Sequence, residues 1–429
     1  MVPRLTNAQR VAYLGGAFSI GVFSAFNNFT MSLWLTSFTS SYVLISLLGN
    51  SKSIEGSIVS PLTGIWSDRV WVPWLGRRRP FILVGGLLSA LLVALTPTIA
   101  SLPMPGGLGL PGEMAQIASI VLAVFLFTLT FNMVDDLHKT LRADLAEEAE
   151  LNFLSSLATI VDIGAQVAFL VLGFLIWSDR VPDSAFSLAG ALIAVGVLVT
   201  TFGIREPPPE VWATMHSAEA NGVAPSARAS FATLRARYTG AFMFILVTFF
   251  YWSGVNAVLP LLSIFVRDIL NASAGEAQLL PGLLLLSTTL MAVPAAWLGT
   301  RFGKRRTLAA GYVLVGVAAA IGLVITTKEQ GAMLFFLAGL GNSAAVVLAI
   351  PLLADLIPRQ QMGAGAGLLA AAGALAAPLA SFVAGGLADV FGPRAIFAVM
   401  GVMVGIAIVL LLGVRTPREV LAEEQSPEG

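Results

Sequence analysis

Six ionisable side chains occur inside stretches of the sequence that are otherwise almost entirely apolar. They are Lys52, Glu55, Asp135, Asp136, Lys139 and Asp162. A carboxylate in a water-poor environment can bind and release a proton or hold a small cation, and a nearby lysine changes the local charge balance. The residue types therefore indicate an ion-coupling site, provided that the surrounding segments lie in a membrane.

The composition places these groups in a membrane. Of the 429 residues, 57% are hydrophobic and 11% are charged, whereas soluble domains have about a quarter charged residues. The absence of cysteine excludes disulfides and cysteine metal sites, and two histidines are too few for a histidine-rich metal cluster. The formal net charge is zero. We expect no enzymatic activity, no cofactor, no bound metal and no nucleic-acid partner.

Apolar runs of the roughly 20 residues that a membrane helix needs recur along the chain. They predict an all-α membrane protein with about twelve transmembrane helices, the first of which we expect to be retained and not cleaved as a signal. The predicted spans are 11–36, 42–67, 80–101, 116–141, 151–177, 184–204, 238–266, 279–299, 307–327, 331–354, 362–388 and 394–414.

The basic residues predict the orientation of these spans. With both termini in the cytoplasm, 18 of the 24 lysine and arginine residues lie on the cytoplasmic side, 4 lie on the other side, and Lys52 and Lys139 lie within helices. Such a bias is typical of multi-pass proteins, whose cytoplasmic loops are rich in positive charge. We expect a multi-pass protein of a bacterial-type cell inner membrane.

The two halves of the sequence repeat each other. Residues 143–145 and 354–356 both read Ala-Asp-Leu, and the basic loops at residues 76–79 and 303–306 hold equivalent places. A long polar stretch separates the halves. We expect an N-terminal six-helix bundle over 1–204, a cytoplasmic linker over 205–237, and a C-terminal bundle over 238–429 with a short cytoplasmic tail. Internal repeats of this kind are typical of alternating-access transporters.

Three carboxylates fall near the middle of the bilayer. At 1.5 Å per residue, Glu55 lies roughly 20 Å above Asp68, Asp135 lies roughly 14 Å above Asp144, and Asp162 lies roughly 16 Å into its helix. The spacing of Asn132, Asp135, Asp136 and Lys139 places them on one helix face. The polar residues that we expect to contact a solute are Asn27, Asn28, Asn132 and Gln166 in the first half and the neutral or aromatic Tyr251, Trp252, Asn256 and Asn342 in the second.

The loop after the second span carries a family motif. Residues 60–69 (SPLTGIWSDR) and 76–82 (GRRRPFI) resemble the signature of sucrose–proton symporters and the related glycoside–pentoside–hexuronide:cation symporters of the major facilitator superfamily. Asn152, Ser156 and Gly164 are similar to that group's fifth helix. The resemblance covers about residues 15–180, and those symporters place an acid near Thr128, which this chain lacks.

The resemblance implies two pseudo-symmetric six-helix halves and a cytoplasmic gate made of charge pairs. It also implies that membrane carboxylates, here Glu55 with Asp135 or Asp136, carry the coupling cation. The residues assigned to the gate are Asp68, Arg69, Arg77, Arg78, Arg79, Arg142 and Asp144.

The function predicted from these features is symport of a small neutral solute, a sugar or glycoside, with H⁺ or Na⁺, by a monomer in the lipid bilayer. Two alternatives stay open: a facilitator-fold exporter of drugs or metabolites by proton antiport, and an assembly factor for pigment–protein complexes that transports nothing.

Structural interpretations of the same residues also stay open. Lys52 and Glu55 could neutralise each other, and one of the two adjacent aspartates could pair with Lys139 or Arg142. Structural roles are likewise open for Asp162 as a packing contact and for His138, Tyr251 and Trp252.

Overall fold

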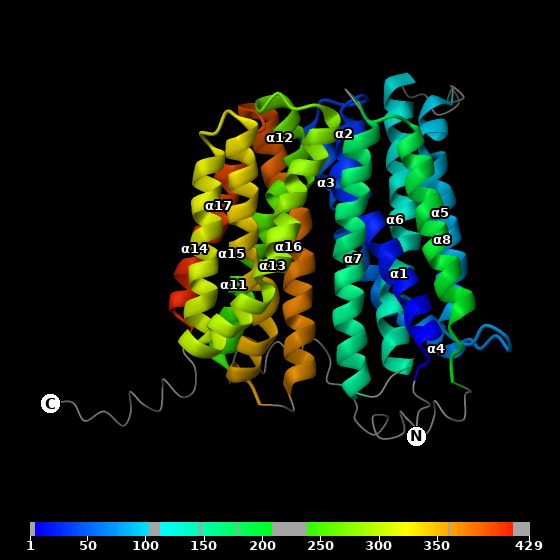
Figure 1. Ribbon diagram of the computed structural model, residues 1–429. Coiled ribbons are helices and arrows are strands. Elements are labelled where there is room, and N and C mark those ends of the chain that lie inside the picture. The colour runs from blue at the N-terminus through cyan, green and yellow to red at the C-terminus, as the bar shows by residue number, and fades with distance from the viewer. Residues whose placement is uncertain are drawn as a thin grey trace, which may run out of the picture. The chain divides into compact units, whose positions relative to one another are not determined.

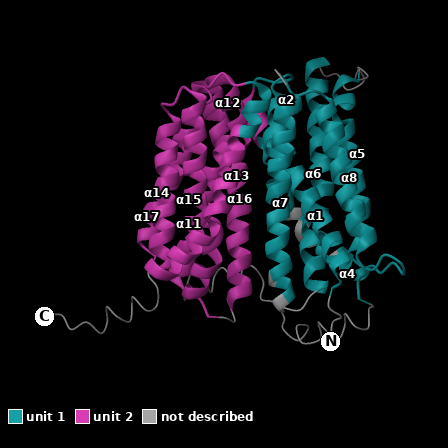
Figure 2. Ribbon diagram, viewed as in Figure 1, with its two compact units in different colours: residues 1–40, 47–222, 273–279 teal, residues 41–46, 223–272, 280–429 magenta. Residues whose placement is uncertain are grey.

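The computed structural model describes residues 5–102, 112–145, 148–177, 180–207, 238–358 and 361–414. Throughout this part the regular elements are helices, with one isolated bridge between Val72 and Gly76. The chain divides into two compact units (Figure 2). Unit 1 comprises residues 1–40, 47–222 and 273–279, and unit 2 comprises residues 41–46, 223–272 and 280–429.

The first half of the chain forms six consecutive helical segments in the residues described. They are α1 (Asn7–Ala25) continued by η1 (Phe26–Thr30) and α2 (Met31–Leu35); α3 (Tyr42–Gly49) with α4 (Ser51–Arg69); α5 (Arg79–Ser101); α6 (Gly112–Leu145); α7 (Glu148–Ile176); and α8 (Ser184–Gly203). Figure 1 shows the long helices of this half running alongside one another.

The second half forms six more segments in the part that the structure describes. They are α11 (Thr239–Val258) continued by η3 (Leu259–Leu261) and α12 (Leu262–Ile269); α13 (Ala274–Phe302); α14 (Lys304–Gly322); α15 (Lys328–Leu356); α16 (Met362–Phe391); and α17 (Ala395–Leu412). These twelve segments confirm the predicted spans. The largest differences are five residues, at Ala274 against a predicted 279 and at Gly322 against a predicted 327.

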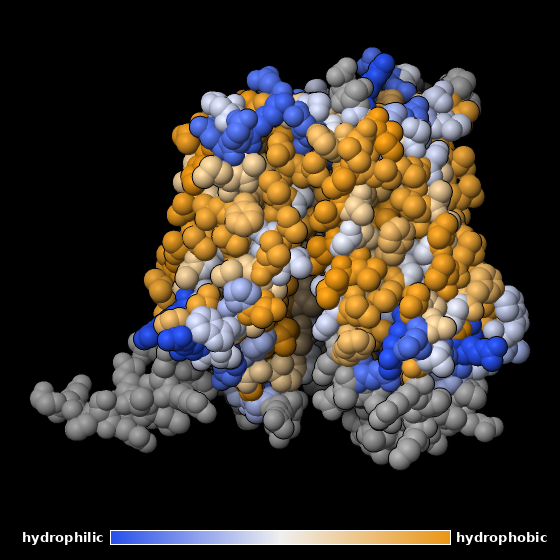
Figure 3. Space-filling view, in the orientation of Figure 1, coloured by the Kyte–Doolittle hydropathy of each residue, from blue (hydrophilic) through white to orange (hydrophobic). Residues whose placement is uncertain are grey.

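The surface of the helices suits a membrane. Nine of the segments in the described residues are long and apolar enough to cross one. The other three are shorter or less apolar: η1 interrupts the first, the second is broken at Asn50, and α14 begins with three basic residues. On the face shown in Figure 3, apolar side chains cover the middle of each unit and hydrophilic ones gather near the ends.

Helix ends and helix contacts follow local chemistry. Thr6 caps α1 and Thr327 caps α15, each in a reciprocal capping box with the glutamine three residues later.

Inside unit 1 the helices approach closely through glycine, as membrane helices commonly do. At Gly196 on α8, a Cβ atom would overlap the carbonyl oxygen of Gly15 and the hydroxyl of Ser19 on α1.

We therefore expect Gly196→Ala to destabilise unit 1 by about 1–3 kcal/mol, the usual cost of overpacking a close contact. The measurement is the midpoint of thermal unfolding, Tm, in detergent. Gly164→Ala is the matched control, because a Cβ there has nothing within 4 Å. Equal Tm values for the two variants would contradict the close α1–α8 approach.

Candidate functional site

Four helices of unit 1, α1, α4, α6 and α7, line an open polar cavity of about 270 Å³. Its ionisable lining comes from Lys52 on α4, from Asp135, His138, Lys139 and Arg142 on α6, from Asp162 on α7, and from Tyr13 on α1. The structure thus brings most of the predicted coupling residues together. Asp136, half-buried on α6, and Glu55, buried on α4, are not among the described residues that line this cavity.

Asp135 lies between two ammonium groups. Its Oδ2 is 2.9 Å from Nζ of Lys52, and its Oδ1 is 2.9 Å from Nζ of Lys139, one turn further along α6. The exposed side-chain fractions are 9% for Asp135, 22% for Lys52 and 59% for Lys139. The ion pair to Lys52 joins two helices, whereas the ion pair to Lys139 stays within one.

Glu55 lies one turn along α4 from Lys52 and has a different partner. Its Oε1 accepts a hydrogen bond of 2.7 Å from the hydroxyl of Thr128 on α6, and its buried Oε2 has no hydrogen-bond partner. The suggested pairing of Lys52 with Glu55 is therefore wrong, because the lysine reaches across to α6 and binds Asp135. Thr128, near the place where the resembling symporters carry an acid, supplies only a hydroxyl.

Two helix irregularities of unit 1 lie close together. The π-helical turn η1 interrupts the first segment at Asn27 and Asn28, and π turns often occur at functional sites. The amide of Asn27 donates to the carbonyl of Gly49, 2.8 Å away, where α3 ends before Asn50. Asn27 Oδ1 is buried with no hydrogen-bond partner.

The remaining predicted residues of unit 1 make local bonds. Asn132 Nδ2 donates to the backbone carbonyl of Lys52 over 3.0 Å, and Gln166 Nε2 donates to Asp162 Oδ1 over 3.0 Å. Asn132 thus positions the backbone of α4, and Gln166 orients Asp162 on its own helix.

Sequence reasoning did not find the contact of His138 with Tyr13. The two rings stack with centroids 4.2 Å apart, His138 Nε2 lies 2.9 Å from the backbone oxygen of Tyr13, and the Tyr13 hydroxyl donates to the backbone oxygen of His138. A Cβ at Gly16 would overlap the imidazole. The only sequence signal was a histidine beside the charged stripe, since its partner lies 125 residues away.

The predicted gate residues form a second ionic cluster at the basic end of unit 1. Asp144 Oδ2 lies 3.0 Å from Arg77 Nη2 and 3.1 Å from Arg78 Nε. Asp68 Oδ1 lies 2.7 Å from Arg78 Nη2 and 3.5 Å from Arg77 Nη1. We call these four residues the basic cluster. Arg69 is exposed, and Arg142 lines the cavity instead.

Glu206, just after α8, contacts the same arginine segment. The sequence analysis did not predict this residue. Its carboxylate accepts hydrogen bonds from the backbone amides of Arg77, Arg78 and Arg79, and it lies 3.6 Å from Nε of Arg79. Because free amides at a helix N-terminus favour an anion, Glu206 stabilises the start of α5. Gly76, at φ +83°, lies directly against it and has no room for a Cβ.

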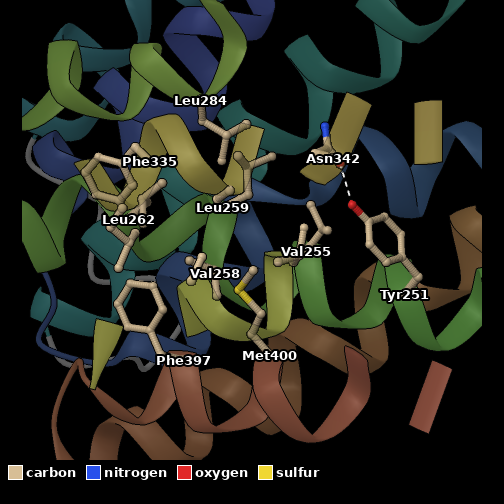
Figure 4. A pocket seen from close by; sticks show the side chains of 14 residues that line it. Tyr251, Val255, Val258, Leu259, Leu262, Leu284, Phe335, Asn342, Phe397 and Met400 are labelled. Atoms are coloured by element: carbon tan, nitrogen blue, oxygen red, sulfur yellow. Dashed lines mark hydrogen bonds between the residues drawn. The ribbon is translucent and has the colours of Figure 1, made fainter. Parts of the chain in front are cut away.

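The predicted residues of unit 2 are neutral and hydrogen-bonded. The Tyr251 hydroxyl donates to Asn342 Oδ1 over 2.8 Å (Figure 4). Asn342 Nδ2 in turn donates to Thr288. Asn256 bonds back to the carbonyl of Trp252 on its own helix. Tyr251 and Asn342 border an apolar void of about 30 Å³, roughly the space of one water molecule.

Two bundles of membrane-length helices, one of which buries charged side chains, define a polytopic α-helical membrane protein. A family model described as Major Facilitator Superfamily matches residues 244–429. The sucrose transport protein SUC3 of Arabidopsis thaliana is 26% identical over 190 residues, which are 39% of this chain and 32% of that protein. The chain thus aligns with about a third of the length of this relative.

Solved structures share the fold over nearly the whole chain. The nucleoside transporter NupG superposes with a TM-score of 0.69 at 14% identity, covering 95% of this chain and 98% of NupG. A D-xylose-proton symporter superposes with a TM-score of 0.67 at 17% identity, covering 94% of this chain and 95% of that one. These findings confirm the resemblance to the major facilitator superfamily, whose proteins are in general not enzymes.

In the basic cluster, we expect Asp144→Asn to destabilise the protein by about 3–5 kcal/mol, because two buried arginines lose their shared countercharge. Asp68→Asn removes a carboxylate that is 50% exposed and should cost no more than about 1 kcal/mol. The check is the Tm of each variant in detergent. An Asp68→Asn loss equal to that of Asp144→Asn would contradict the assignment of Asp144 as the buried centre.

Proposed function

We propose that this protein is a secondary transporter that moves a neutral sugar or glycoside together with a proton by alternating access. The observation that carries the proposal is Glu55, a carboxyl group with 6% exposure inside the membrane, bonded to a hydroxyl by one oxygen and unbonded at the other. Intramembrane carboxyl groups are costly to keep, and they are typical of proton and ion pathways.

Glu55 suits proton binding better than Asp135 does. Protonating Asp135 would remove the negative charge from two ion pairs of 2.9 Å. Protonating Glu55 breaks no ion pair among the described residues, and the Thr128 hydroxyl can donate to a carboxylate or accept from a carboxylic acid. Glu55 can therefore change its charge while the network around Asp135 stays intact.

The cavity of unit 1 suits a small polyol. Its volume of about 270 Å³ is close to the lower end of ligand pockets, about 300–1,000 Å³. Its lining offers both donors and acceptors, through Lys139 and Asp162 among others. The partial match to a sucrose transport protein and the shared fold with a D-xylose-proton symporter favour a sugar as the solute.

The basic cluster would then serve as the gate. Arg77 and Arg78 share carboxylates from the ends of α4 and α6, so a movement that separates these ends costs ion pairs. Such a cluster can favour one of two conformations by a few kcal/mol, which is the range needed for a switch.

The test is proton uptake by proteoliposomes that contain a pH dye. We expect sucrose, maltose or another sugar of a test panel to cause internal acidification with the parent protein. Glu55→Gln should reduce this signal to that of protein-free vesicles, because the amide cannot carry the proton, while exchange of labelled sugar continues. Glu113→Gln, at the exposed start of α6, is the matched control and should acidify normally.

The other outcomes are equally informative. Internal alkalinisation on adding solute would indicate antiport and support the exporter alternative. An absence of flux for every sugar, with folded protein and with H⁺ or Na⁺ gradients, would contradict sugar symport and leave the assembly-factor alternative to be tested by co-purification.

A further inference from the structure

Residues of α6 contact both the backbone and the side chain of Lys52. Its backbone carbonyl accepts the amide of Asn132, and its ammonium lies 2.9 Å from Asp135 Oδ2. Asn132 and Asp135 are three residues apart and share one face of α6. The lysine side chain is therefore positioned by two contacts and is not a loosely placed surface charge.

The surroundings of the Lys52 ammonium have the chemistry of a cation site. Apart from the Asp135 carboxylate, it lies 5.8 Å from the ring centroid of Phe23 and 5.5 Å from that of Phe131. These two rings stack at 3.7 Å. Because the rings are stacked on each other and the ammonium is nearly equidistant from both centroids, the ammonium lies beside the ring edges. The Asp135 carboxylate therefore supplies the attraction for a cation, and here a side chain of the protein occupies that position.

The charges that line the cavity disfavour a further cation beside Asp135. Lys52, Lys139 and Arg142 line it, against Asp135 and Asp162, so positive side chains exceed negative ones by one. A metal ion entering beside Asp135 would add to this excess in a medium where unpaired charge is expensive. Removing Lys52 would balance the lining and free one oxygen of Asp135.

We propose that Lys52 is a tethered cation, which occupies at Asp135 the position that a free monovalent cation would otherwise take. Na⁺ is thereby excluded from Asp135, and Glu55 is left as the carboxyl group for the coupling ion. The occupancy of the site is independent of transport, whereas its consequence for coupling rests on the proposed symport.

Chemical rescue tests the occupancy. Lys52→Ala removes three methylene groups and the ammonium, so n-propylammonium matches the missing part. We expect the Tm of Lys52→Ala in detergent to lie below that of the parent. Propylammonium chloride should raise it by ~2–4 °C in a saturable manner, relative to equimolar choline chloride, which has no N–H to donate to the carboxylate. The parent should unfold at the same Tm in sodium, propylammonium and choline chloride.

Lys52→Met is the matched control. It loses the same charge, but its side chain fills most of the space that the lysine side chain leaves, so propylammonium should leave its Tm unchanged. Lys139→Ala should also respond little, because that side chain is 59% exposed and the space it leaves is not enclosed by protein. If Lys52→Ala unfolds during purification in choline chloride, its recovery in propylammonium chloride gives the same information.

Two results would overturn the proposal: a Lys52→Ala protein that does not respond to propylammonium, or equal responses of Lys52→Ala and Lys52→Met. A parent protein stabilised by Na⁺ over choline, with the effect retained in Glu55→Gln, would also overturn it. Because none of these measurements uses a sugar, failure of sugar-dependent proton uptake with normal rescue would reject the proposed function alone.

Discussion

The negative charge of Asp135 must be neutralised in a medium that solvates ions poorly, and much of unit 1 is arranged by that requirement. Two ammonium groups lie 2.9 Å from its oxygens. Only the Lys52 contact joins separate helices, and Asn132 adds a backbone contact beside it. The α4–α6 contact is therefore set by electrostatics, in a region where lipid gives the helices no hydrophobic reason to associate.

The same constraint acts at the basic end of unit 1, with different partners. Three consecutive arginines are neutralised by carboxylates from the end of α4, the end of α6 and the residues after α8. Glu206 binds backbone amides as well as an arginine, so it fixes the start of α5 and the direction of the arginine side chains together. Charges supplied by segments distant in sequence thus hold these helix ends in register.

Unit 2 has no buried charge to neutralise among its described residues. The buried polar side chains among its described residues are neutral, and several polar side chains there bond to each other or to their own helix, as Tyr251 does with Asn342. The two halves share the same order of helices, but only unit 1 has buried charged side chains among the residues described. In the proposed function, this asymmetry favours ion coupling in unit 1 and leaves unit 2 to provide hydrogen bonds and aromatic surface to a solute.

The sequence by itself determined the positions of the helices and the candidate ion-coupling residues. Apolar runs predicted twelve segments to within five residues, because in lipid each backbone must satisfy its own hydrogen bonds along a helix. The rarity of charge in those runs identified Glu55, Asp135 and Asp162. Only the tertiary structure decided the pairing: Lys52 binds Asp135 and not Glu55, His138 stacks on Tyr13, and Glu206 joins the arginines. Local spacing cannot predict these choices, because each depends on which faces of separate helices meet.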